Sequence, residues 1–276
     1  MVVAMLMFSA MGVLVKMAGQ SIPPSETVLF RALISGIVVW LMAKRRGIRL
    51  AGDRTGLLFL RGLAGAFALF LFFFALTKLS VGSAILLNQT TPLFLLPMAA
   101  VFLREKITAR HVVLAVTTAA GVALVVKPSS DMDITPALMA LGSAFFAASA
   151  YILVRKLSAT EHPLTIVFWF NLIATIAAVP VAAPHFVLPD ATAWLLLIGL
   201  SLFATFGQVL MTHAYRLNEA GRLAVVGSTG AIFGAGFDYL IWNHLPDALT
   251  AIGGIVVIVS CTLMQLTRTT RQQPPL

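Results

Sequence analysis

The segment GSAILLNQTTPLFLLPMAAVFLRE, Gly82–Glu105, decides how the rest of the chain is interpreted. Over about twenty residues it is apolar enough for a helix that crosses a bilayer. Near its middle, however, stand five consecutive polar or helix-breaking residues: Asn88, Gln89, Thr90, Thr91 and Pro92. In hydrocarbon such an interruption is tolerated only where protein groups or a wet cavity satisfy the freed backbone groups. The segment therefore predicts a membrane helix that is broken at a functional position.

A second interrupted segment lies 139 positions later and aligns with the first without a gap. Three residues recur at this shift, paired as Gly82 with Gly221, Thr90 with Thr229, and Phe94 with Phe233. The second segment has its own weak centre, because residues 227–230 read Gly-Ser-Thr-Gly. Paired interruptions in the two halves of a membrane protein are the best indication in a sequence of a transport site.

Composition places the whole chain in a membrane. Hydrophobic residues make up 59% and charged residues 11%, and the mean hydropathy is +0.97, whereas a soluble domain is roughly 25% charged. The net charge of +9 would indicate nucleic-acid binding only if the basic residues shared one solvated face. They fall instead in short loops between apolar runs, as membrane topology requires, so we expect no nucleic-acid partner.

Ten apolar segments emerge when the chain is divided at charged residues, prolines and glycines, and each is near the ~20 residues of a membrane-spanning helix. They are residues 2–18, 24–43, 55–77, 81–103, 108–126, 134–154, 163–183, 190–214, 220–242 and 247–266. Met1–Met17 has no basic n-region and no small-residue cleavage site, so we expect it to stay as the first helix. The predicted fold class is an all-α integral membrane protein with ten transmembrane helices.

The loops predict the orientation. With the amino terminus inside, fourteen basic residues face the cytoplasm, against Lys16, Lys78 and Lys127 outside, with Arg31 and Arg61 left within spans. The fourteen are Lys44, Arg45, Arg46, Arg49, Arg54, Arg104, Lys106, Arg110, Arg155, Lys156, Arg216, Arg222, Arg268 and Arg271. This bias is a strong positive-inside signal, and it predicts an inner (plasma) membrane protein with both termini cytoplasmic.

The shift of 139 extends over further helices, because Pro24 falls on Pro163, Leu63 on Leu202, Phe67 on Phe206 and Ala75 on Ala214. Each half then holds five spans, an odd number, so the second copy enters the membrane upside down. We expect a first five-helix repeat over residues 1–127, a second, inverted repeat over residues 134–268 and a cytoplasmic tail over residues 269–276. Inverted repeats are the usual scaffold for alternating access.

Several markers give the chain a family resemblance over essentially its whole length. Lys16 closes the first span, Pro24 opens the second with Arg31 inside it, and residues 91–94 (Thr-Pro-Leu-Phe) lead to residues 102–108 (Phe-Leu-Arg-Glu-Lys-Ile-Thr). In this order the markers resemble the EamA family of the drug/metabolite transporter superfamily. The resemblance implies export of small metabolites, amino acids first. The second half departs from the family pattern, because Ala231 and His244 stand where the family often repeats a proline and a glutamate, which suggests functionally asymmetric halves.

Candidate substrate-binding residues combine apolar walls with a few polar groups, as small-molecule sites do. They are Ser9, Arg31, Phe67, Phe70, Asn88, Gln89, Thr91, Phe145, Phe206, Gln208 and Gly230. We expect Asn88 and Gln89 to contact the polar end of the substrate and the phenylalanines to favour aromatic and other apolar amino acids. The competing interpretation of these side chains is lipid-facing rings and ordinary hydrogen bonds between helices.

Arg31 has two interpretations. Its burial about seven residues into a span costs at least ~2.5 kcal/mol unless it is paired or hydrated. A guanidinium suits a substrate carboxylate, but a structural or coupling ion pair with Asp238, at a comparable depth, is the favoured interpretation. Asp238 also continues a stripe of small residues, Gly227, Gly230 and Gly234, which predicts either close packing against the fourth span or a cavity wall of bare backbone.

Several functions lack their motifs. There is no Walker loop, no metal-ligand spacing of His, Cys or carboxylates and no nucleophile with a positioned base, so we expect neither an enzyme nor a cofactor or metal. The prediction is a secondary transporter that exports amino acids by alternating access, with a small molecule and membrane lipid as its partners and a monomer as its state. A broad exporter of drugs or nucleoside-like compounds is the alternative, and a passive channel is the alternative of a different class. Proton-coupled and facilitative transport both stay open, with Arg31, Asp238 and His213 as the ionisable groups within spans.

Overall fold

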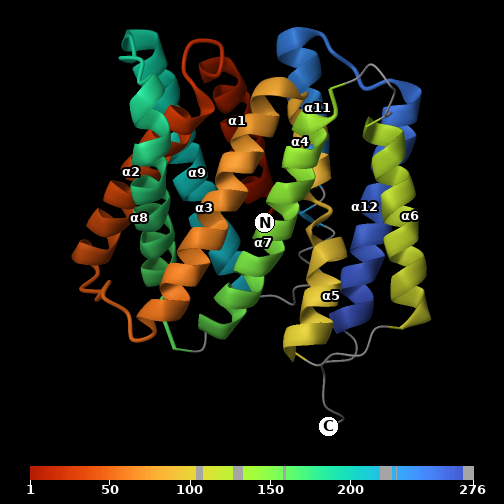
Figure 1. The fold of residues 1–276 in the computed structure, drawn as a ribbon, viewed down its shortest axis with the longest axis horizontal. Coiled ribbons are helices and arrows are strands. Elements are labelled where there is room, and N and C mark those ends of the chain that lie inside the picture. Colours follow the sequence, from red (N-terminus) through yellow and green to blue (C-terminus); the bar gives the residue numbers. More distant parts are fainter. Residues whose placement is uncertain (104–107, 127–132, 158–159, 218–225, 228, 270–276) are drawn as a thin grey trace.

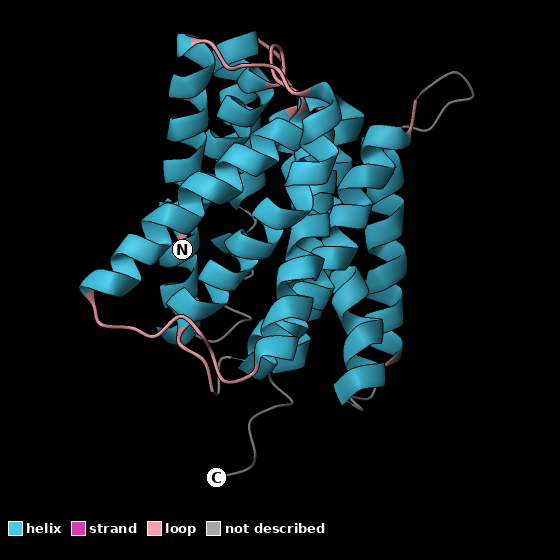
Figure 2. Ribbon diagram, turned by 60° about the vertical axis from the view of Figure 1, so that its left-hand side comes forward, coloured by secondary structure: helices cyan, strands magenta, loops and turns pink. Residues whose placement is uncertain are grey.

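The computed structural model describes residues 1–103, 108–126, 133–157, 160–217, 226–227 and 229–269. In these ranges the chain forms helices joined by turns and loops, without a β-strand (Figure 2). The all-helical fold class is therefore confirmed for the described residues. The helices stand roughly side by side in one bundle (Figure 1).

The described helices follow the predicted apolar segments closely. They are α1 (Val2–Ala18), α2 (Pro24–Arg45), α3 (Thr55–Lys78), α4 (Val81–Asn88), α5 (Thr91–Leu103), α6 (Ala109–Val126), α7 (Thr135–Leu157), α8 (Pro163–Ala182), the short 3₁₀ helix η1 (Ala183–His185), α9 (Ala191–Leu217), α11 (Thr229–Trp242) and α12 (Ala248–Thr269). Six of them, namely α2, α3, α6, α7, α8 and α9, are long and apolar enough to cross a membrane.

Local sequence accounts for several helix starts. Pro24 and Pro163 occupy the first turns of α2 and α8, where a missing backbone N–H costs nothing and the fixed φ angle suits a helix. The Oγ of Ser80 accepts a hydrogen bond from the backbone N–H of Ser83 and caps α4. His162 plays the same part for α8, because its ring nitrogen accepts from the N–H of Leu164.

The predicted break in the 81–103 segment is confirmed. α4 ends at Asn88 and α5 begins at Thr91, so two short helices replace one long one. Gln89 and Thr90 form the turn between them, and the chain restarts with a hydrogen bond from the N–H of Leu93 to the carbonyl oxygen of Thr90, 2.8 Å. In the corresponding later segment only residues 226–227 and α11 are described, so Gly221 and Ser228 lie outside the described residues.

Helices of the first half pack against helices of the second. α1 contacts α9 and α11, α2 contacts α8 and α9, and α3 contacts α7 and α8. α4 and α5 both contact α7, and α4 also packs on α11. α6 and α12 form a pair of their own at one side of the bundle, as Figure 1 shows. The core between the halves is apolar and includes the buried side chains of Phe73, Leu76, Leu87, Leu197 and Leu200.

Glycines bring the backbones of α4 and α11 together. A Cβ atom on Gly234 would lie 3.0 Å from both the Cα and the N atom of Gly82, and a Cβ on Gly82 would lie 2.9 Å from the N atom of Ala235. Neither backbone has room for a larger side chain. Of the two interpretations of the small-residue stripe, the structure confirms close packing against the fourth predicted span, at the level of Gly234.

Candidate substrate-binding site

Two amide side chains join the helix break to the second half of the chain. Asn88 donates through Nδ2 to the Oγ of Ser143 on α7, 2.7 Å, and that hydroxyl donates in turn to the carbonyl oxygen of Ala140. Gln89 donates through Nε2 to the carbonyl oxygen of Gly227, 2.7 Å. The break therefore places two hydrogen-bonding amide side chains among apolar helices.

Threonine hydroxyls satisfy part of the freed backbone. Thr90 donates to the carbonyl oxygen of Leu87, and Thr91 donates to that of Asn88, over 2.7 and 2.6 Å. Both threonines are buried. Thr229 repeats the first of these bonds, because its hydroxyl donates to the carbonyl oxygen of Val226 over 2.7 Å. Thr229 and Val226 follow Thr90 and Leu87 by the repeat distance of 139, so the two segments that the sequence pairs share the same local hydrogen bond.

Ser9 on α1 contacts the first turn of α11. Its Oγ lies 2.9 Å from the carbonyl oxygen of Gly230 and 3.0 Å from that of Met5, one turn earlier on α1. The side chain is fully buried. Next to this bond, the open face of Gly230 meets the side chains of Met5 and Ile85. The structure thus brings together five predicted site residues around the break between α4 and α5 and the start of α11: Ser9, Asn88, Gln89, Thr91 and Gly230.

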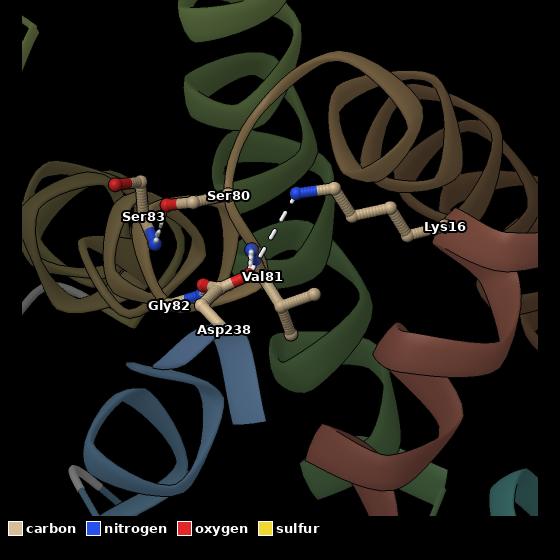
Figure 3. Close-up of polar contacts among 6 residues, drawn as sticks. All are labelled: Lys16, Ser80, Val81, Gly82, Ser83 and Asp238. Atoms are coloured by element: carbon tan, nitrogen blue, oxygen red, sulfur yellow. Dashed lines mark hydrogen bonds and ion pairs between the residues drawn. The ribbon is translucent and has the colours of Figure 1, made fainter. Parts of the chain in front are cut away.

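Asp238 closes one end of this region (Figure 3). Its Oδ1 and Oδ2 accept the backbone N–H groups of Val81 and Gly82, 3.0 and 2.8 Å, at the start of α4. The Nζ of Lys16, at the end of α1, lies 3.7 Å from Oδ1 and 4.6 Å from the ring centroid of Trp242. One buried carboxylate therefore joins α1, α4 and α11.

The predicted ion pair between Arg31 and Asp238 is wrong. Asp238 pairs with Lys16, and Arg31 donates instead to the Oδ1 of Asn171 on α8, 3.1 Å, and to the Oε1 of Gln208 on α9, 3.3 Å. The depth estimate placed the two charges level. Depth along a helix does not say which helices are neighbours. Arg31 and Asp238 lie apart because α2 packs on α8 and α9, whereas α11 packs on α1 and α4. Gln208, a predicted site residue, is thereby joined to Arg31.

Arg61 on α3 is a buried charge that sequence reasoning noted only as lying within a span. Its guanidinium carbon lies 4.8 Å from the ring centroid of Phe170, and that of Arg31 lies 5.1 Å from the same centroid. Gly65 makes room for this contact, because a Cβ atom there would collide with Nη1 of Arg61 and lie 2.7 Å from Cδ2 of Phe170. The signal available in the sequence was a second arginine inside an apolar segment.

Aromatic side chains form a chain of ring contacts beside the break. Phe67 on α3 stacks on Phe146 at 5.2 Å, Phe146 contacts Phe145 at 5.4 Å, and Phe145 contacts Phe94 on α5 at 5.8 Å. Two predicted site residues, Phe67 and Phe145, belong to this chain and stay 49% and 42% exposed.

The structure does not bring the remaining predicted rings into this chain. Phe70 packs half-buried on the main core, and Phe206 is exposed on α9. The candidate site is thus two groups: the break group around Asn88 and Gln89, and the arginine group around Arg31. Among the described residues no cluster of His, Cys, Asp and Glu is arranged to hold a metal ion. The side chain of His213 lies outside the described part of the chain.

The chain matches one protein family over nearly its whole length. The EamA-like transporter family matches residues 1–127 and again residues 134–266. A pseudopaline exporter of Pseudomonas aeruginosa is 34% identical over 269 residues, which cover 97% of this chain and 95% of the exporter.

More distant relatives are transporters as well. A riboflavin transporter of Vibrio cholerae is 28% identical, over 86% of this chain and 81% of its own. The human solute carrier family 35 member G1 is 26% identical, over 87% of this chain and 71% of its own. A protein of known crystal structure superposes with a TM-score of 0.69 over 99% of this chain and 96% of its own; at 17% identity this likeness shows the fold alone.

Proposed function

Because the chain belongs to the EamA-like transporter family, we propose that it is a secondary transporter that exports a small metabolite across the bacterial inner membrane by alternating access. The observation that carries the proposal is the break between α4 and α5. There Asn88 and Gln89 reach residues of the second half, Ser143 and Gly227. Polar groups at a helix break between two halves of a membrane protein are the usual setting of a transport site.

Two inverted repeats of five membrane-spanning helices each, over residues 1–127 and 134–268, are part of the proposal. A shift of 139 residues superposes the sequence ranges of five helix pairs: α1 on α7, α2 on α8, α3 on α9, α5 on α11, and α6 on α12. Under this correspondence the contact of α1 with α9 is equivalent to that of α7 with α3. The contact of α1 with α11 is likewise equivalent to that of α7 with α5. A pseudo-two-fold relation between the halves explains why these contacts occur in pairs.

We place both termini in the cytoplasm, on the strength of the positive-inside bias. The loops that precede α3 and α8 then lie together at the cytoplasmic end. Their contacts support a position on the same side of the membrane. Glu161 accepts the backbone N–H groups of Asp53 and Arg54, both at 2.8 Å, and Thr165 donates to the carbonyl oxygen of Arg49. The pair of Lys16 and Asp238 then closes the periplasmic end.

The substrate that we propose is an amino acid or a metabolite derived from one. The full-length similarity to a pseudopaline exporter supports export rather than uptake as the direction. Asn88, Gln89 and Thr91 would hold the polar end of the substrate, with Ser9 and Gly230 beside them and the exposed rings of Phe67 and Phe145 along its apolar part. Gln208 belongs to the arginine group, and Phe70 and Phe206 lie outside the chain of rings beside the break.

Uptake of radiolabelled amino acids into proteoliposomes tests the proposal, with and without a pH gradient. The variants are Asn88→Ala and, as a control, Thr117→Ala, which removes an exposed hydroxyl on α6. We expect saturable uptake with counterflow in the unaltered chain and in Thr117→Ala, and a loss of at least tenfold in Asn88→Ala. Dependence on the pH gradient separates proton-coupled from facilitative transport. Uptake that is equal in all three proteins contradicts the assignment of the break.

The same vesicles discriminate the alternatives. A broad exporter of drugs or nucleoside-like compounds would be inhibited by bulky cations and flavins, and the similarity to a riboflavin transporter is the observation that favours such compounds. A passive channel would show flux without saturation or counterflow.

A further inference from the structure

Two arginines lie side by side deep in the bundle. Arg31 belongs to the eighth position of α2 and Arg61 to the seventh position of α3. Their side chains are 3% and 6% exposed, and both guanidinium groups contact the ring of Phe170 on α8. Two like charges are thus held within a few ångströms of one aromatic ring in the apolar part of the protein.

Both guanidinium groups keep unused donors. The Nε of Arg31 and the Nε and Nη1 of Arg61 are buried without a hydrogen-bond partner. Arg31 is partly satisfied by Asn171 and Gln208, whereas Arg61 contacts the ring of Phe170 and interacts electrostatically with Tyr151 on α7. A cation over an aromatic ring gains ~0.5–2 kcal/mol, but burial of an ion costs several kcal/mol. The ring therefore does not offset the burial of Arg61.

The buried carboxylates of the described residues are engaged elsewhere. Glu26 accepts the N–H of Val187 through Oε1, and its buried Oε2 has no hydrogen-bond partner. Glu161 accepts the N–H groups of the loop before α3, and Asp238 accepts those of α4 and pairs with Lys16. Within the described ranges of the chain, the ion pair of Lys16 and Asp238 is the one that forms. The two arginines therefore form a positive centre whose counter-charge the described residues do not supply.

We propose that Arg61 and Arg31, with Phe170 between their helices, form an anion subsite of the transporter that binds a carboxylate of the exported substrate. This inference rests on the proposed function and deepens it, because it names the charge of the substrate. The planar fork of a guanidinium binds a carboxylate through two parallel hydrogen bonds. Arg61 keeps an unpartnered donor at Nε, on the edge that Nε shares with Nη2, and a second unpartnered donor at Nη1.

Two positive charges also select against cations. The ammonium group of a neutral amino acid would be repelled by the arginines, which offsets part of the attraction of its single carboxylate. A substrate with at least one carboxylate in excess of its amines suits the centre better. The subsite therefore predicts a net-negative metabolite, such as an acidic amino acid or a compound with several carboxylates. The unpartnered donors are buried in this conformation. Entry of a substrate carboxylate therefore requires movement of α3, in the first half, against α8, in the second half.

Binding to the purified full-length chain in detergent tests the subsite, read as the shift of the thermal unfolding midpoint during titration at constant ionic strength. The probes are L-glutamine, L-glutamate and propane-1,2,3-tricarboxylate, which differ in their number of carboxylates. We expect apparent affinity to rise with that number, about tenfold from glutamine to glutamate, as one additional charge-assisted contact implies. Equal response to the three probes, or response to none of them, overturns the proposal.

Variants identify the residues. Arg61→Gln should abolish the preference for the anions, and Arg61→Lys, which keeps the charge without the fork, should recover part of it. Arg110→Gln, at an exposed arginine of α6, is the matched control and should keep the full preference. If Arg61→Gln does not fold, Phe170→Leu keeps both arginines and should reduce the preference several-fold. A preference that survives in Arg61→Gln assigns the arginine a structural role and contradicts the subsite.

Transport separates failure of the subsite from failure of the function. Saturable counterflow of neutral amino acids that exceeds that of glutamate and the tricarboxylate leaves the transporter assignment intact and overturns the anion subsite. Absence of saturable flux for every probe, together with unsaturable leak, overturns the proposed function as well.

Discussion

The Nζ atom of Lys16 lies 3.7 Å from the Oδ1 atom of Asp238, and this contact links α1 to α11. The same carboxylate accepts two backbone N–H groups at the start of α4. These are two of the four amide groups that the first turn of any helix leaves without a partner inside the helix. Asp238 therefore adds to the Ser80 cap of α4 and fixes three helices at one point.

Replacing Asp238 with Asn should destabilise the protein. The amide has a single acceptor oxygen, so one N–H of Val81 or Gly82 loses its partner, and the second bond loses its charge. Hydrogen bonds to charged groups contribute about 1.5–3 kcal/mol each, and we expect a loss of about 2–3 kcal/mol in the free energy of unfolding. Thermal unfolding in detergent measures this change. Asp247→Asn, in the exposed loop before α12, is the control and should change little.

Replacing Lys16 with Met should cost less than the change at Asp238. The lysine side chain is 24% exposed, and partly solvated ion pairs contribute about 0–1 kcal/mol. The main effect should fall on transport, because α1 and α11 lose their tie at the proposed periplasmic end. Accessibility of a cysteine introduced at Ser80 to an impermeant maleimide should rise in Lys16→Met relative to the unaltered lysine. Unchanged labelling would show that the pair does not restrain this end.

Gly234→Ala should separate α4 from α11. Its added methyl group would lie 3.0 Å from backbone atoms of Gly82, and backbone has no rotamer through which it can move away. Such overpacking costs about 1–3 kcal/mol. The matched control is Gly236→Ala on the same helix, where an added Cβ would meet nothing within 4 Å. The unfolding midpoint should fall for Gly234→Ala and rise slightly or stay constant for Gly236→Ala; a reversed order would contradict the described contact.

Glu161→Ala should loosen the start of α3. One carboxylate oxygen accepts the N–H groups of Asp53 and Arg54, and the residue is 8% exposed. Without it the two amides are open to water, so hydrogen exchange over residues 52–58 should accelerate by at least tenfold. Mass spectrometry of peptides from this region measures the rate. Asp190→Ala, which removes a similar bond at the start of α9, should affect its own helix and leave residues 52–58 unchanged.

Asn88 and Ser143 should be energetically coupled. Their 2.7 Å hydrogen bond joins the helix break to α7, and a bond of this kind contributes about 1 kcal/mol. A double-mutant cycle of Asn88→Ala and Ser143→Ala, read by thermal unfolding, should give an interaction energy near that value. Additive effects of the two substitutions would show that the bond does not form in the membrane protein as purified.

Hydrophobic patterning alone located the helices. The spans predicted over residues 24–43, 55–77 and 163–183 became α2, α3 and α8 with ends displaced by a few residues. The break at Gln89 and Thr90 also followed from the sequence, because a polar and proline-bearing stretch is incompatible with a continuous lipid-facing helix. These features depend on local composition, which the sequence contains in full.

The partners of the buried charges were decided by the tertiary structure. Depth along a helix predicted a pair of Arg31 with Asp238, but neighbouring helices are chosen by packing of small and apolar surfaces, such as Gly82 on Gly234. That choice placed Asp238 beside Lys16 and α4, and it placed Arg31 beside Asn171, Gln208 and Arg61.

The sequence by itself thus determined an all-helical membrane chain, the place of its interrupted helix and its resemblance to a transporter family. It did so because length, hydropathy and helix breakers act over a single turn or span. Only the tertiary structure decided that Arg31 and Arg61 both contact Phe170. It also decided that Asp238 joins α1, α4 and α11 instead. The physical reason is that charge pairing requires atoms within about 4 Å, and such distances are set by contacts between residues far apart in the chain.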